Sequence, residues 1–134
     1  MADLGVGVER VDYIRVPAKD IEEAKHFYGE LLGLPLDPNS PHDDWVEFEA
    51  GNVTLAVMTP HTHEYEFSPL PPGTIALRVA DVAEAKAKLE AAGVEFLGEP
   101  WDSGVCHGAV FTDPDGNGLA LHHRYEPYPD GSTP

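Results

Sequence analysis

The chain carries one sequence pattern twice, and this repeat limits its possible folds more than any other feature. Residues 13–25 (YIRVPAKDIEEAK) correspond to residues 74–86 (TIALRVADVAEAK), so that Tyr13 matches Thr74 and Asp20 matches Asp81 at the same spacing. Each copy reads as a short strand, an acidic residue and a helix. The repeat therefore predicts two similar units packed together.

Each predicted helix begins with two carboxylates at capping-box spacing. Asp20 with Glu23, and Asp81 with Glu84, can accept hydrogen bonds from free amides at the helix start and favour the positive end of the helix dipole. Apolar residues recur behind them at the helical period and end at a glycine. The predicted helices cover residues 21–32 and 82–92, before Gly33 and Gly93.

Strand signals follow each helix, with turn residues between them. The order is βαβββ, twice, which is an α+β architecture: two modules form a curled mixed sheet around a cleft, with the helices on the outer face. We expect a single domain, with module one at about 9–58, a linker at 59–73, module two at about 74–124 and a C-terminal tail at 125–134. The predicted strands after the helices cover residues 34–36, 45–49 and 53–58, then 94–97, 109–112 and 119–122.

Two motifs resemble those of the vicinal-oxygen-chelate superfamily, the glyoxalase / bleomycin-resistance / extradiol-dioxygenase fold. They are FTDPDGN at residues 111–117 and DIEEAKHFY at residues 20–28, which runs into Leu32 and Gly33. With the repeat, the resemblance covers roughly residues 9–124. It implies the fold but leaves the function open, because this superfamily includes metal-dependent lyases, isomerases and dioxygenases as well as dimeric drug-sequestering proteins.

Strand side chains alternate between two faces, and the apolar set is expected beneath the helices. Ile14, Val16, Leu55 and Val57 go to that side in the first half, and Leu119 and Leu121 do so in the last strand. The cleft then receives the alternate residues, which are Tyr13, Arg15, Thr54, Ala56, Met58, Thr74, Ala76, Arg78, Ala120 and His122.

The resemblance implies one metal ligand on each of four cleft strands. Carried over position by position, these ligands would be Tyr13, Ala56, Thr74 and Ala120. Alanine has no donor atom, and the four together are not a usual set for a divalent ion. We therefore expect no metal and no other cofactor.

Several cleft residues are candidates for ligand contact. His122 and Tyr13 are weak candidates for acid–base catalysis. Arg15 could pair with an anionic ligand or with Glu47, and Trp45 could form an aromatic wall. Residues 101–107 are expected to form a loop at one end of the cleft. The predicted ligand-binding residues are Tyr13, Arg15, Trp45, Glu47, Ala56, Met58, Thr74, Trp101, His107, Ala120 and His122.

Two further groups carry weaker signals. Cys106 beside His107 suggests a nucleophile pair only weakly, because neighbours on an extended chain point in opposite directions. His61 and His63 could share a metal with Glu64 or His42, but loop histidines are far more often simply exposed.

Charge narrows the partners. Asp and Glu number 24 against 8 Lys and Arg, and the net charge is −16. Such a chain repels nucleic acid and anionic membranes and would attract a cationic ligand, although acidity can also serve solubility alone. No transmembrane run or signal peptide is visible, and the single cysteine fits a reducing cytoplasm.

The sequence supports three functions in order. The first is a metal-free protein that sequesters or recognises a small ligand, cationic or aromatic, as a homodimer. The second is a metal-dependent lyase, isomerase or dioxygenase with non-standard ligands such as His122, Glu47 and His107. The third is a metal-free acid–base enzyme that uses His122 and Tyr13.

Overall fold

The computed structural model describes residues 5–40, 42–60 and 66–134. The first half contains strand β1 (Tyr13–Pro17), helix α1 (Ile21–Ala24) with its π-helical continuation η1 (Lys25–Leu31), and strands β2 (Trp45–Glu49) and β3 (Thr54–Met58). The second half contains strand β4 (Ile75–Arg78), helix α2 (Val82–Ala91), and strands β5 (Phe96–Asp102), β6 (Cys106–Thr112) and β7 (Gly118–Arg124).

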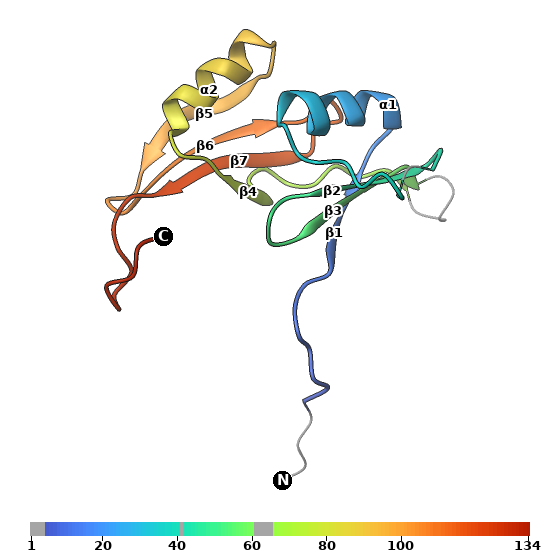
Figure 1. Cartoon of the computed structure of the whole chain (residues 1–134). Coiled ribbons are helices and arrows are strands. Elements are labelled where there is room, and N and C mark those ends of the chain that lie inside the picture. Colours follow the sequence, from blue (N-terminus) through green and yellow to red (C-terminus); the bar gives the residue numbers. More distant parts are fainter. Residues whose placement is uncertain (1–4, 41, 61–65) are drawn as a thin grey trace.

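The strands form two mixed sheets. The first sheet has the order β1-β3-β2 and the second the order β4-β7-β6-β5, and in each the strand before the helix pairs parallel to the last strand. The helices cover one face, and the N-terminal segment and C-terminal tail project on the other side (Figure 1). We call the face opposite the helices the concave face. The predicted α+β class with curled sheets is confirmed.

One hydrophobic core runs beneath the helices and joins the two halves. Phe27 of η1 lies 6.4 Å from Phe111 of β6, ring centre to ring centre, and the Tyr28 ring lies 5.9 Å from that of Phe48. The predicted caps are present, since Asp20 accepts from the amides of Glu22 and Glu23. Asp81 likewise accepts from the amide of Glu84.

The turn at residues 113–117 ties the halves together through buried polar contacts. Tyr28 donates its hydroxyl to Asp113 at 2.6 Å, and Asn117 donates to the Pro17 carbonyl at 2.7 Å. Asn117 also accepts from the amide of Leu70, so the same turn holds the segment between the halves. Burial, followed by the nearby Asp113 charge, raises the pKa of Tyr28 far above its usual value, so this phenol stays protonated.

The structure differs from the sequence expectations in three places. The first helix is α-helical only to Ala24 and then widens to i→i+5 hydrogen bonds, such as Leu32 N–H to the Phe27 carbonyl at 2.9 Å. The wider turn lets consecutive Phe27 and Tyr28 both enter the core.

Residues 34–36 form only an isolated bridge at Leu36 rather than a strand. The loop expected at residues 101–107 is confined to residues 103–105, because β5 continues to Asp102 and β6 begins at Cys106.

None of the helices in the described parts of the chain combines the length and apolar character needed to cross a membrane.

Candidate ligand-binding site on the concave face

The alternation expected for the strands is present. Leu55, Val57, Leu119 and Leu121 belong to the core beneath the helices. Ala56 and Ala120 are also buried, but neither belongs to that core cluster of the described residues. This division places the two alanines on the concave face.

On the first sheet, two aromatic rings meet across the middle strand. Tyr13 on β1 is level with Thr54 and Trp45 on β2 is level with Met58, which places Ala56 between them. The Tyr13 and Trp45 rings contact edge to face, with centres 5.9 Å apart. We call them the aromatic pair. Ala56 lies under it with 0 % of its surface exposed.

Two charged residues flank the same alanine. Arg15 and Glu47 are the register partners of Ala56 on either side. Glu47 accepts from the Trp45 indole N–H at 3.0 Å, so this carboxylate positions the indole. Arg15 and Met58 instead line a small cavity of about 200 Å³ that residues 66–70 help to close.

On the second sheet, one row of paired residues crosses all four strands. Trp101 on β5 pairs with Gly108 on β6, Gly108 with His122 on β7, and His122 with Arg78 on β4. The Trp101 indole lies beside the His122 imidazole, with ring centres 5.9 Å apart. We call these four residues the concave row. It offers an aromatic surface, an imidazole and a guanidinium in sequence, which suits a planar ligand with a polar end.

Gly108 makes this arrangement possible. A Cβ at that position would overlap three atoms of the Trp101 indole, so the indole lies directly on the glycine backbone. Trp101 nevertheless remains 41 % exposed, and its free face is available to a ligand. Neither Gly108 nor Arg78 was among the predicted site residues. The sequence signal for Gly108 is a glycine inside a strand, which marks a close approach of another group to the backbone. The signal for Arg78 is side-chain alternation along β4.

The four positions that correspond to the family's metal ligands do not fit a metal ion. Ala56 and Ala120 are buried methyl groups without donor atoms, and the hydroxyl of Thr74 donates to the Pro71 carbonyl. Among residues 5–40, 42–60 and 66–134, no three His, Cys, Asp or Glu side chains are grouped closely enough to hold an ion.

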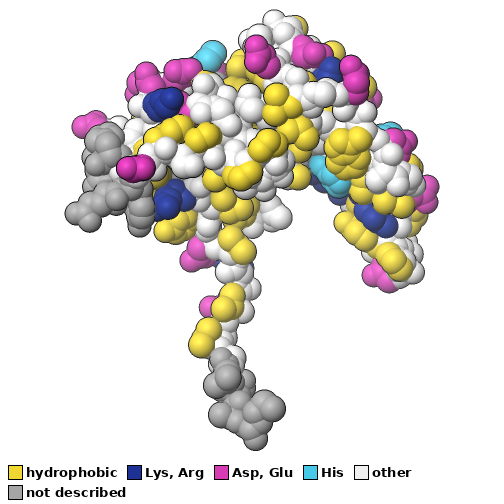
Figure 2. Space-filling model, turned by 180° about the vertical axis from the view of Figure 1, so that it is seen from behind, with side chains coloured by type: hydrophobic (Ala, Val, Ile, Leu, Met, Phe, Trp, Pro, Cys, Tyr) yellow, Lys and Arg dark blue, Asp and Glu magenta, His cyan; other side chains and the backbone are white. Residues whose placement is uncertain are grey.

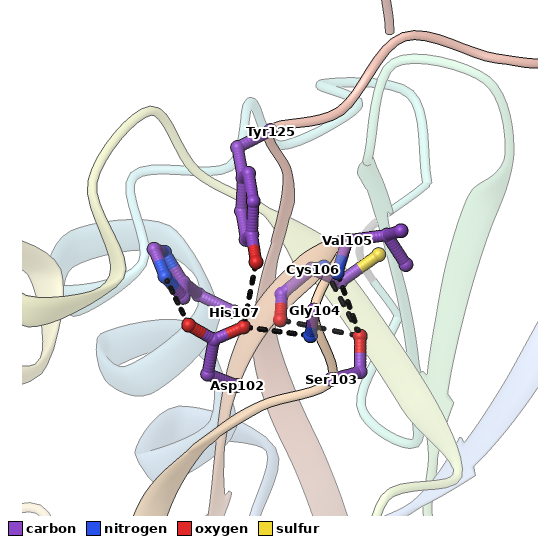
Figure 3. Close-up of polar contacts among 7 residues, drawn as sticks. All are labelled: Asp102, Ser103, Gly104, Val105, Cys106, His107 and Tyr125. Atoms are coloured by element: carbon purple, nitrogen blue, oxygen red, sulfur yellow. Dashed lines mark hydrogen bonds and ion pairs between the residues drawn. The ribbon is translucent and has the colours of Figure 1, made fainter.

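His107 does not lie in the cleft, because alternation along β6 puts it on the face of Ala109 and Phe111, which is the helix face. Its register partner there is His123. The expectation that His107 lies at one end of the cleft is therefore wrong. Cys106 points the other way from His107 (Figure 3), so these neighbours do not form a nucleophile pair.

On the helix face, His107 joins a separate polar cluster (Figure 3). Its Nε2 lies 3.3 Å from Asp102, which also accepts from the Tyr125 hydroxyl at 2.7 Å and from the Gly104 amide. The Gly104 amide, together with Tyr125 and His107, lowers the pKa of Asp102. The hydrogen bond to Asp102 raises the pKa of Tyr125 to about 12. The cluster borders an open cavity of about 490 Å³ beside the start of α2.

His42 forms a bridge with Trp45, and His61, His63 and Glu64 lie outside the described residues. The predicted ligand-binding residues that lie on the concave face are Tyr13, Arg15, Trp45, Glu47, Ala56 and Met58 in the first sheet, and Trp101, Ala120 and His122 in the second.

Known proteins share this architecture. TnmS3, an antibiotic-binding protein from Streptomyces sp. CB03234, is 28% identical and superposes with a TM-score of 0.73 over 90% of this chain and 99% of its own. A glyoxalase/bleomycin resistance protein from the same organism is also 28% identical, with a TM-score of 0.68 over 86% of this chain and 100% of its own. The uncharacterised protein YetH of Bacillus subtilis (strain 168) is 29% identical over 85% of this chain and 98% of its own. Residues 10–121 match the family described as Glyoxalase/Bleomycin resistance protein/Dioxygenase superfamily, and the chain belongs to that superfamily.

Proposed function

We propose that this protein binds a small aromatic molecule on its concave face, without a metal ion, and that it does so as a homodimer. The observation that carries the proposal is the concave row, in which an exposed indole lies on a glycine beside an imidazole and a guanidinium. A flat aromatic ligand can stack on the free face of Trp101 while His122 and Arg78 contact its polar groups.

Similarity supports binding rather than a particular reaction. TnmS3 is described as an antibiotic-binding protein, and it matches this chain over nearly its whole length. Two positions of this chain that correspond to metal ligands in the metal-dependent enzymes also favour metal-free binding, since Ala56 and Ala120 offer no donor atom.

The dimer is proposed from the shape of one chain. The concave face is an open hollow between the N-terminal segment and the C-terminal tail (Figure 2). Val6, Val8 and Val11 of the N-terminal segment are 87 %, 82 % and 63 % exposed. A second copy would cover these valines and close the hollow around a ligand.

The alternative is a metal-dependent lyase, isomerase or dioxygenase that uses His122, Glu47 and His107. These three residues do not converge, because Glu47 belongs to the first sheet and His107 to the helix face of the second. Elemental analysis of protein purified without a histidine tag separates the two functions. A stoichiometric divalent metal that is lost in His122→Ala would favour the enzyme.

Calorimetric titration with a panel of planar aromatics tests the proposed function directly. We expect binding that Trp101→Ala weakens by about tenfold or more, because stacking on an indole contributes roughly 1–1.5 kcal/mol beyond area burial. Lys88→Gln on the helix face serves as the control and should bind normally. Light scattering of the full chain, with and without residues 5–11, tests the dimer: a monomer in both cases would contradict it.

A further inference from the structure

The positive charges of the chain are divided between its two faces. Arg78 and Arg124 lie on the concave face, because Arg78 pairs with His122 and Arg124 is two residues beyond His122 on β7. Arg15 occupies the same face of the first sheet. Three of the four arginines thus lie on one face of a chain whose net charge is −16. In Figure 2, positive and histidine side chains gather under the body beside the C-terminal tail.

The lysines are arranged differently. Lys25 lies 3.1 Å from Glu22, Lys86 3.0 Å from Glu90 and Lys88 3.3 Å from Glu84, all on the helices. These ion pairs neutralise the lysines locally. No such pair involves Arg78 or Arg124 within the described parts of the chain, although acidic residues outnumber basic ones by 24 to 8.

Backbone oxygens and one ring contact the two arginines instead. Arg78 donates to the backbone oxygen of Pro134 at 2.8 Å, and Arg124 donates to the Pro127 carbonyl at 3.0 Å. The Arg124 guanidinium also lies 4.5 Å from the centre of the Tyr128 ring. Its Nε is buried and has no hydrogen-bond partner among the described atoms. The tail therefore contacts both guanidiniums through backbone oxygens and the Tyr128 ring rather than through acidic side chains.

Resting on the proposed function, we infer that the ligand is an aromatic acid, whose carboxylate or similar anionic group is held by Arg78 and Arg124 while its ring stacks on Trp101. A guanidinium offers two parallel N–H donors that match a carboxylate, and the charged hydrogen bonds are stronger than those to a carbonyl. The carboxylate displaces the tail oxygens, and His122 lies between the acid and the indole. The net charge of −16 repels anions at long range, so recognition of the acid depends on these local contacts.

This inference reverses the ligand charge expected from composition. Net charge alone favours a cation, but the concave row places a guanidinium and an imidazole next to the indole. A cationic ligand stacked there would meet like charge at close range.

Three naphthalene probes of equal shape test the inference by calorimetry with the full chain: 2-naphthoate, neutral 2-naphthamide and cationic 2-naphthylmethylammonium. We expect 2-naphthoate to bind about tenfold or more tightly than the other two. The double variant Arg78→Gln/Arg124→Gln should lose this preference and bind 2-naphthoate no more tightly than 2-naphthamide, and an unchanged far-ultraviolet circular dichroism spectrum would show that its fold is intact. Lys88→Gln should behave as the parent protein.

Each other outcome counts against the inference in its own way. If the amide or the ammonium probe binds as tightly as 2-naphthoate, the proposed function stands and the aromatic acid is wrong. If the double variant keeps the preference for 2-naphthoate, the two arginines are not the anion site. If no probe binds, the proposed function and the inference both fail.

Discussion

Replacing Gly108 with alanine tests the structure of the concave row most directly. The new Cβ would overlap the Trp101 indole, so the indole has to leave its place on the sheet. Trp101 is 41 % exposed, so roughly 150 Å² of covered surface is at stake, worth about 4 kcal/mol if the ring leaves completely. Because the ring can tilt into solvent and keep part of its contact, we expect a loss of about 1–3 kcal/mol in the free energy of unfolding.

The same substitution should have the opposite sign once the indole is gone. Gly108 does not adopt a positive φ, so alanine fits its backbone. In a Trp101→Ala background, Gly108→Ala should stabilise by about 0.4–1 kcal/mol, because alanine reduces the freedom of the unfolded chain. The two substitutions are then coupled by about 1.4–4 kcal/mol.

Urea denaturation followed by far-ultraviolet circular dichroism measures all four members of this cycle without depending on tryptophan fluorescence. Equal effects of Gly108→Ala in both backgrounds would falsify the contact between Trp101 and the glycine backbone, and with it the concave row.

Three further outcomes follow from individual contacts. Tyr28→Phe leaves Asp113 buried with one donor fewer and should cost about 1.5–3 kcal/mol in urea denaturation, since the lost bond goes to a charged group; an unchanged midpoint would contradict the buried bond. Tyr125 should ionise with a pKa of about 12, so its contact with Asp102 is present below pH 10 and is lost as the pH rises through 12; Tyr125→Phe should remove this phase from a spectrophotometric titration. Ala56→Leu should force the aromatic pair apart and cost about 1–3 kcal/mol in thermal unfolding, while ligand titration of the second sheet stays unchanged.

Local signals made most of the fold predictable. The repeat gave two strand–helix units, the carboxylates at Asp20 and Asp81 marked both helix starts, and Leu55 and Leu119 showed which face of their strands is buried. These features depend on neighbours in sequence or on a period of two or about four residues, so a single chain is enough to read them.

The errors arose where the register of strands matters. An irregularity in the strand register between Leu97 and Trp101 lets β5 continue to Asp102, where a loop was expected at residues 101–107. Ala109, two residues beyond His107 on β6, lies in the core and so fixes the face on which His107 lies. Because β5 continues to Asp102 and β6 begins at Cys106, side chains that were expected in a loop each point to a definite face of the sheet.

The two halves of the repeat differ at one position of the concave face. Ala56 and Ala120 occupy equivalent places in the two halves. Trp45 pairs with Met58, two residues after Ala56, and Gly108 pairs with His122, two residues after Ala120, so Gly108 is the equivalent of Trp45. The aromatic pair covers the first alanine. The second half has Gly108 there instead, and the Trp101 indole from β5 lies over this glycine beside His122.

This asymmetry predicts which tryptophan senses the ligand. The chain has two, Trp45 and Trp101, and both lie on the concave face. If the ligand stacks on Trp101, Trp45→Phe should keep the fluorescence response to 2-naphthoate, whereas Trp101→Phe should abolish it. A response carried by Trp45 would instead place the ligand on the first sheet, because fluorescence quenching by stacking requires direct contact.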